Sequence, residues 1–206
     1  MVDFNVRRGV TAPRIDPRVE NKARETRSLD PVVAERKQQI RDVMDGWEKP
    51  LEDNVRNTTW NSSPSLSTNT CGNASPKTTA ILNKEGIPAQ TVRTDAHVFV
   101  ESKTDKGDVI VDPTIRQFFG ADNAPKDMKK IFVGTKDELK QFWRDNDQYR
   151  TKKGITADQQ FHEVYEEKKR VRKDSEMDSD VRAETQRLLE TSPAMRSLRG
   201  ESGYDR

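Results

Sequence analysis

Hydrophobic residues in the first part of this chain recur at helical spacing. Between positions 28 and 48, apolar side chains stand three or four residues apart, which predicts an amphipathic helix with one buried face. Pro31 suits the first turn of this helix, and Pro50 is expected to end it. The predicted apolar face consists of Val32, Val33, Ile40, Val43, Met44 and Trp47.

In the middle of the chain the pattern changes to that of β-strands. Residues 96–101 and 108–112 are rich in β-branched and aromatic side chains, and the polar segment 102–107 between them ends in glycine. This pattern predicts a β-hairpin. Residues 87–93 are expected to form a strand leading into the hairpin, and residues 131–133 a further short strand. The predicted sheet is therefore antiparallel.

The apolar residues of the hairpin also predict its register. Pairing Val98 with Val111 aligns the other apolar residues of both strands. In this register His97 lies directly opposite Asp112. Directly opposed residues share one face of a sheet, with Cβ atoms about 5 Å apart. The pattern that pairs the valines thus predicts contact between the imidazole and the carboxylate.

A helix is expected to begin at Cys71, the only cysteine of the chain. Pro76 suits its first turn, and Gly86 suits its C-terminal cap. Caps and apolar spacing predict later helices from Thr135 onward, over 155–173 and over 179–190.

These elements predict an α+β fold in which an antiparallel sheet packs against the helix at Cys71, with charged helices at the flanks. Of 206 residues, 31% are hydrophobic and 35% are charged, and the mean hydropathy is −1.01. A compact centre of roughly 100–130 residues is therefore expected. We divide the chain into a flexible N-terminal tail (1–27), a compact domain that carries the candidate chemistry (28–150) and a charged helical C-terminal extension (151–206).

Composition argues against several classes of protein. The net charge of +2 gives no general affinity for nucleic acid, and one cysteine allows no internal disulfide, which suits a reducing cytoplasm. No apolar run approaches the ~18 residues of a membrane span, and the N-terminus lacks the apolar region of a secretory signal. No metal-ligand spacing or phosphate-binding loop is present, so we predict no metal and no other cofactor. His162 is expected at the surface.

Cys71, His97 and Asp112 form the candidate catalytic set. A helix N-terminus presents free N–H groups and partial positive charge, which lower the pKa of a thiol and can stabilise an oxyanion. His97 would accept the thiol proton, and Asp112 would orient the imidazole and stabilise its charged form. Taken singly, each residue has a common structural role, but their combination in this order favours catalysis.

The order Cys71, His97, Asp112 resembles that of transglutaminase-like and papain-like cysteine enzymes. The run His-Val-Phe-Val-Glu from His97, followed by Gly-Asp-Val-Ile-Val-Asp-Pro-Thr from Gly107, is similar to the transglutaminase-type pattern. The run Asp-Pro-Thr-Ile-Arg-Gln-Phe from Asp112 looks closer to the papain-like glutamine deamidase domains of bacterial toxins and effectors. The resemblance covers about a quarter of the chain.

This resemblance implies a papain/transglutaminase-like core and a papain-like catalytic domain at 28–150. The implied activity is cysteine-dependent acyl transfer, most specifically glutamine deamidation of a target-cell protein by a toxin or effector. A transglutaminase or a cysteine protease would use the same triad, and a non-catalytic helical interaction protein is the alternative outside the enzymes. The implied partners are a protein substrate and, for delivery into a target or host cell, a secretion machine, chaperone or immunity protein.

Three further residues are candidates for oxyanion or substrate binding. Asn69 is the nearest amide before Cys71, where papain-type proteases carry a glutamine. Trp60 lies in the polar segment that leads to the cysteine and is a candidate floor for a substrate cleft. Gln117 belongs to the deamidase-like run that begins at Asp112.

Overall fold

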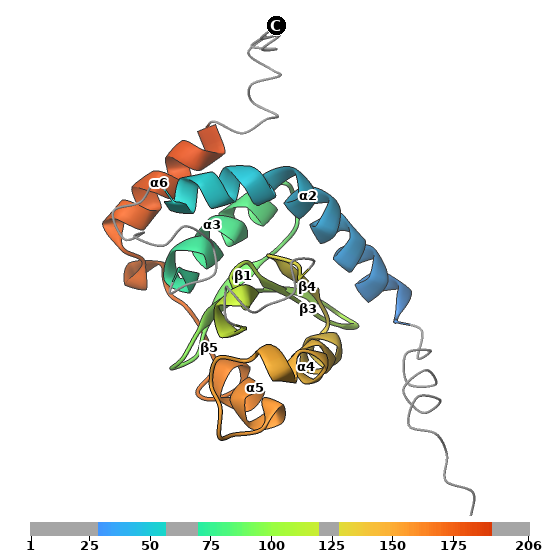
Figure 1. Cartoon of the computed structure of the whole chain (residues 1–206). Coiled ribbons are helices and arrows are strands. Elements are labelled where there is room, and N and C mark those ends of the chain that lie inside the picture. Colours follow the sequence, from blue (N-terminus) through green and yellow to red (C-terminus); the bar gives the residue numbers. More distant parts are fainter. Residues whose placement is uncertain (1–28, 57–69, 120–127, 191–206) are drawn as a thin grey trace, which may run out of the picture. The chain divides into compact units, whose positions relative to one another are not determined.

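The computed structural model describes residues 29–56, 70–119 and 128–190 (Figure 1). The helices are α2 (Pro31–Arg56), α3 (Cys71–Lys84), α4 (Lys136–Asp145), α5 (Ala157–Tyr165) and α6 (Ser179–Glu190). The strands are β1 (Gln90–Arg93), β2 (Val98–Thr104), β3 (Gly107–Asp112), β4 (Phe132–Gly134) and β5 (Arg170–Val171). Short 3-10 helices are η1 (Ile115–Phe118), η2 (Asp147–Tyr149) and η3 (Asp174–Glu176). The predicted N-terminal tail (1–27), Trp60 and Asn69 lie outside the described residues.

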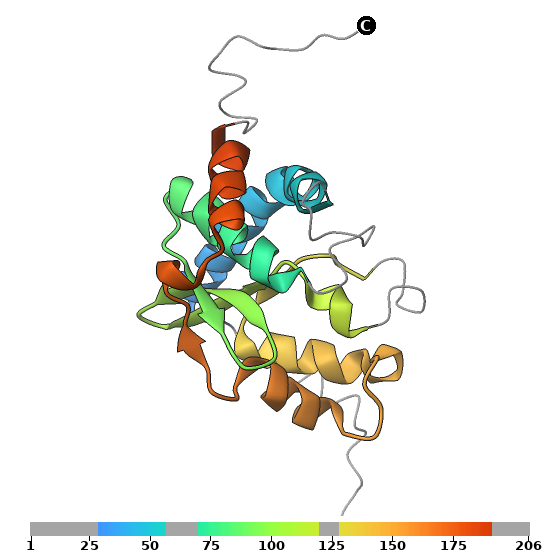
Figure 2. The ribbon, with the colours of Figure 1, turned by 90° about the vertical axis from the view of Figure 1, so that its left-hand side faces the viewer.

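The five strands form one antiparallel sheet in the order β4-β3-β2-β1-β5. Helices α2, α3 and α6 lie on one face of this sheet, and α4 and α5 lie on the other (Figures 1 and 2). The predicted α+β class and the predicted antiparallel sheet are therefore confirmed.

The register of the β2–β3 hairpin differs from the predicted one. Val100, and not Val98, pairs with Val111. Both strands continue through what was expected to be a polar loop and meet at a two-residue turn, residues 105–106. Gly107 follows that turn with a φ of 148°, a conformation that favours glycine. The shorter turn moves the pairing by two residues.

The shift leaves each side chain on its predicted face, because the faces of a strand alternate with a period of two. The prediction that His97 lies directly opposite Asp112 is wrong. With Val100 opposite Val111, the position that faces Asp112 falls two residues after His97. His97 and Asp112 are instead diagonal neighbours on the same face. Diagonal neighbours remain within reach of long side chains, and here the two side chains are in contact.

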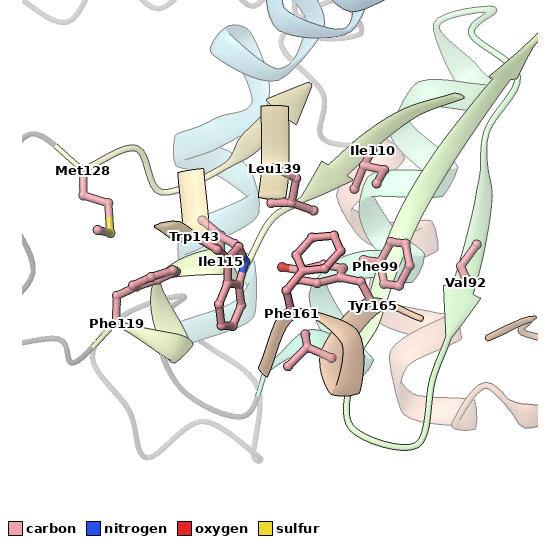
Figure 3. Packing of buried hydrophobic residues seen from close by; sticks show 11 residues of the cluster. Val92, Phe99, Ile110, Ile115, Phe119, Met128, Leu139, Trp143, Phe161 and Tyr165 are labelled. Carbon is pink, nitrogen blue, oxygen red and sulfur yellow. The ribbon is translucent and has the colours of Figure 1, made fainter. Parts of the chain in front are cut away.

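One hydrophobic core lies between the sheet and helices α4 and α5 (Figure 3). Several of its aromatic rings meet edge to face, as in the pairs Phe99–Tyr165 at 5.1 Å and Trp143–Tyr165 at 5.9 Å between ring centroids. Each such large side chain contributes about 1.5–3 kcal/mol by leaving water. The buried members are Val92, Phe99, Ile110, Ile115, Phe119, Met128, Leu139, Trp143, Phe161, Val164 and Tyr165.

On the other face of the sheet, α2 is longer than predicted. Its stripe of Val33, Ile40, Met44 and Trp47 is buried, although Val32 is exposed. The prediction that Pro50 ends this helix is wrong, because α2 continues through Pro50 to Arg56. The next residue, Leu51, is fully buried and gives these last turns an apolar contact.

Helix α5 is shorter than the predicted helix over 155–173. It ends at Tyr165, Lys168 has a positive φ of 50°, and β5 pairs with β1. The charged run after Tyr165 has only Val171 as an apolar residue, so no helical face is available to bury. Elements of the segment 151–206 thus belong to the sheet and the core, and their contacts cross the predicted boundary at residue 150.

Candidate active site

Cys71 is the first residue of α3 and is partly exposed. The carbonyl of Thr70 accepts hydrogen bonds from the backbone N–H groups of Asn73 (2.9 Å) and Ala74 (2.8 Å), which closes the first turn. Pro76 lies in the second turn and not in the first, because the helix begins five residues before it. The sulfur is therefore at a helix N-terminus, where partial positive charge stabilises a thiolate.

His97 closes the turn between β1 and β2. The hydroxyl of Thr94 accepts the backbone N–H of His97 at 3.0 Å and donates to the carbonyl of Val164 in α5 at 2.7 Å. Only 2% of His97 is exposed. The imidazole is therefore held both by its own turn and by the packing of α5 against that turn. Its aromatic neighbours are Phe99, Phe118 and Tyr165.

Asp112 is fully buried at the end of β3 and accepts four hydrogen bonds. Nε2 of His97 lies 2.8 Å from Oδ2, and the hydroxyl of Tyr165 donates to the same oxygen at 2.5 Å. The backbone N–H and the hydroxyl of Thr114 donate to Oδ1 at 2.8 and 3.2 Å. Burial by itself raises the pKa of Asp112, but the charge of His97 and these hydrogen bonds outweigh burial and lower the pKa. The carboxylate is therefore ionised although it is buried.

Cys71 and His97 lie close enough for each to shift the pKa of the other. Nε2 of the imidazole faces Asp112, and Nδ1 lies 3.2 Å from the side-chain nitrogen of Gln117. Burial raises the pKa of Cys71, but the interaction with His97 outweighs it, so the thiol pKa is lowered. Burial lowers the pKa of His97, but Asp112 and Cys71 outweigh it and raise the pKa to about 9. The two shifts favour a thiolate beside an imidazolium at neutral pH.

Gln117 in η1 is the one described member of the predicted oxyanion or substrate-binding group. Its side-chain nitrogen lies 3.2 Å from Nδ1 of His97 and donates to the hydroxyl of Thr114 at 3.0 Å. Gln117 is partly exposed, and its amide lies at the nitrogen of the imidazole that does not face Asp112. This position beside His97 suits an amide that binds a substrate oxygen. The other two members, Trp60 and Asn69, fall outside the described ranges.

Tyr165 and Thr114 contact the site, but sequence reasoning did not assign them a role there. Tyr165 shares an apolar helix face with Phe161, so its ring alone indicates core packing. Its hydroxyl is the added feature, because a buried tyrosine oxygen needs a partner. Thr114 follows Asp112 by two residues. In a turn, an aspartate side chain commonly accepts a hydrogen bond from the backbone N–H two residues later. His162 is exposed as predicted and pairs with Glu166 at 2.7 Å.

Within residues 29–56, 70–119 and 128–190, no three His, Cys, Asp or Glu side chains are grouped closely enough to hold a metal ion. In the same part of the chain, no helix combines the length and the hydropathy that a membrane span requires.

The site therefore joins four segments of the chain: the start of α3, the β1–β2 turn, the end of β3 and the end of α5. A thiolate at a helix N-terminus next to a charged imidazole is competent to attack a carbonyl carbon and to protonate the leaving group. Comparison of the chain with protein-family models, with curated proteins and with solved structures found no match.

Proposed function

We propose that this chain is a cysteine-dependent acyl-transfer enzyme with a papain-like core, acting as a protein glutamine deamidase of the bacterial toxin or effector type. The observation that supports the proposal is that His97 is hydrogen-bonded to the buried carboxylate of Asp112 and lowers the pKa of the partly exposed Cys71. A structural cysteine would be sealed in apolar packing and would have a raised thiol pKa.

In the proposed reaction the Cys71 thiolate attacks the carboxamide carbon of a substrate glutamine. The tetrahedral intermediate collapses as His97 gives its proton to the departing nitrogen, which leaves as ammonia, and a thioester remains on the sulfur. His97 then takes a proton from water, the resulting hydroxide attacks the thioester, and glutamate and the thiolate are released. Asp112 keeps its charge throughout and orients the imidazole.

The same residues would perform two other reactions. If an amine replaces water, the product is an isopeptide crosslink, and if the carbonyl belongs to the backbone, the product is a cleaved chain. What the substrate cleft admits decides between these outcomes. We place deamidation first because the run from Asp112 to Phe118 resembles the deamidase domains most closely and because its amide, Gln117, lies at the imidazole.

The reactivity of the thiol provides a first test. Iodoacetamide at about pH 6 should alkylate Cys71 much faster than a free thiol, since the thiolate is the reactive form. His97→Ala should slow the reaction strongly, whereas His162→Ala, which removes the other histidine at an exposed position, should leave it unchanged. Labelling at the rate of a free thiol would favour a non-catalytic interaction protein.

The products provide the second test. Target-cell proteins are incubated with the wild type or with Cys71→Ala, and their intact masses are compared. Conversion of glutamine to glutamate that appears with the wild type alone would support deamidation. Crosslinked species or fragments would identify a transglutaminase or a protease, and identical masses with both proteins would refute acyl transfer.

A further inference from the structure

Arg172 contacts the Cys71 site although it lies 100 residues after Gly72 in the sequence. It follows β5 directly, and its backbone N–H donates to the carbonyl of Thr91 in β1 at 2.9 Å, which fixes its place beside the sheet. From there Nη1 donates to the carbonyl of Gly72 at 2.9 Å. Gly72 is the residue after Cys71, so this bond acts on the first turn of the nucleophile helix.

The carbonyl of Gly72 needs this external donor because of Pro76. In an α-helix the carbonyl of residue 72 accepts the N–H of residue 76. Proline has no N–H, so the bond cannot form. Arg172 supplies the missing donor from outside the helix. The proline that leaves the carbonyl free and the arginine that binds it are therefore parts of one arrangement.

The guanidinium also interacts electrostatically with the Cys71 thiolate. Nη2 donates to the carbonyl of Glu176 at 2.8 Å, and the Nε–H is buried without an acceptor among the described residues. Burial and the charge of Arg93 lower the pKa of Arg172, whereas Glu176, the Cys71 thiolate and Asp178 act in the opposite direction. An arginine keeps its charge under these conditions.

We propose that Arg172 is a positioning residue of the Cys71 site, which holds the first turn of α3 through Gly72 and stabilises the thiolate by its charge. The proposal rests on the proposed cysteine chemistry, and it assigns part of that chemistry to the predicted charged helical C-terminal extension (151–206). The other charged groups that face the thiol are His97 from the β1–β2 turn and Asp112 from β3.

The first experiment measures the pH dependence of Cys71 alkylation in full-length variants. Arg172→Met should shift the profile to higher pH and slow alkylation at about pH 6 by roughly three- to tenfold, as expected for one partly buried charge. Arg172→Lys should retain most of the rate, and Arg172→Gln, a fallback if the methionine variant folds poorly, should lose it. Arg170→Met is the matched control, because Arg170 lies two residues away, is exposed and pairs with Glu176 at 2.8 Å.

The second experiment separates the charge from the hydrogen bond. Pro76→Ala gives the helix its own N–H for the carbonyl of Gly72. In the double variant Pro76→Ala/Arg172→Met, hydrogen exchange of the amides at residues 71–75 should return to wild-type protection, while alkylation should stay slow. Full recovery of the alkylation rate, or an unchanged profile in Arg172→Met alone, would overturn the proposal. Alkylation needs no substrate, so its dependence on Arg172 without any deamidated protein would refute the proposed function only.

Discussion

The ion pair of the candidate site and the ion pair between α3 and α6 are both buried, but they differ in what else holds them. His97 and Asp112 are 1% and 0% exposed and lie 2.8 Å apart. Lys77 in α3 is fully buried and lies 2.9 Å from Glu184 in α6, which is 22% exposed. Asp112 has three donors besides the imidazole, whereas Glu184 is the described partner of the Lys77 ammonium.

This difference indicates two uses of a buried charge. When His97 gives up its proton, Tyr165 and Thr114 still donate hydrogen bonds to Asp112, so the pair can lose and regain a proton without leaving the buried carboxylate short of donors. Burial lowers the pKa of Lys77, and Glu184 offsets only part of that effect. The second pair is therefore suited to holding α6 against α3 (Figure 2) and not to proton transfer.

The largest effect is expected from Asp112→Asn. The amide keeps the shape of the carboxylate but removes the charge that raises the pKa of His97, and turnover should fall by about 10³–10⁴-fold, as in other triads that lose this carboxylate. Turnover and alkylation of Cys71 at about pH 6 are the measurements. Asp108→Asn is the control, since Asp108 is an exposed residue of the same strand. Near-wild-type turnover in Asp112→Asn would show that this carboxylate has no role in catalysis.

The second prediction breaks the other ion pair. Glu184→Gln should lower the free energy of unfolding by about 2–3 kcal/mol, because it leaves the Lys77 ammonium buried and unpaired; the partial exposure of Glu184 keeps the cost below that of a fully buried pair. Lys77→Met should be neutral or stabilising. Chemical unfolding measures both, with Glu163→Gln in the exposed pair with Lys152 as the control. Equal losses from Glu184→Gln and Lys77→Met would contradict this asymmetry.

The fold was predictable to the extent that it depends on apolar spacing. The strand at β4 and the bounds of α6 follow from local patterns. The hairpin register did not, because registers two residues apart keep each side chain on its face, and the observed one pairs Val109 with Ser102 and Ile110 with Glu101, so the alignment of apolar residues favoured the wrong one. The length of the turn chooses between such registers, and nothing in the polar segment 102–107 shows where the strands end. The predicted faces of both strands were nevertheless correct, because a shift of two residues leaves each side chain on the same face.

The candidate site, too, was predictable from the sequence only in part. Cys71, His97 and Asp112 have side chains whose chemistry is visible in the sequence, and the structure brings them together. The site roles of Tyr165 and Arg172 are not visible there. A tyrosine on an apolar helix face and an arginine in a charged run have ordinary structural explanations, and only the placement of α5 and β5 directs them to the site.

The third prediction concerns pH and tests whether the His97 pair exchanges protons. Its pKa of about 9 lies above the ordinary value of 6.5, so the imidazolium persists until the pH rises through about 9. Turnover should therefore fall above about pH 9 by roughly tenfold per unit, since the leaving group loses its acid. Alkylation, which needs only the thiolate, should not fall. The stabilisation that this pair gives the fold should be complete below pH 6.5 and be lost through the same range near 9. A turnover plateau that continues well beyond that range would refute the assignment.

The smallest effect is expected from Tyr165→Phe, which removes one of the four hydrogen bonds to Asp112 and keeps the ring. The free energy of unfolding at neutral pH should fall by about 1 kcal/mol, the typical net contribution of one hydrogen bond, because Thr114 and His97 still hold the carboxylate. The pKa of Asp112 is lowered in the folded protein partly by Tyr165, so its stabilising contribution is present at neutral pH and lost on acidification. In the variant this loss should begin at a higher pH. Acid unfolding followed by circular dichroism measures the shift, with Tyr149→Phe at the edge of the same aromatic cluster as the control. An unchanged acid transition would mean that the Tyr165 hydroxyl does not help to hold the charge of Asp112, and the contrast between the two buried pairs would then depend on Thr114 alone.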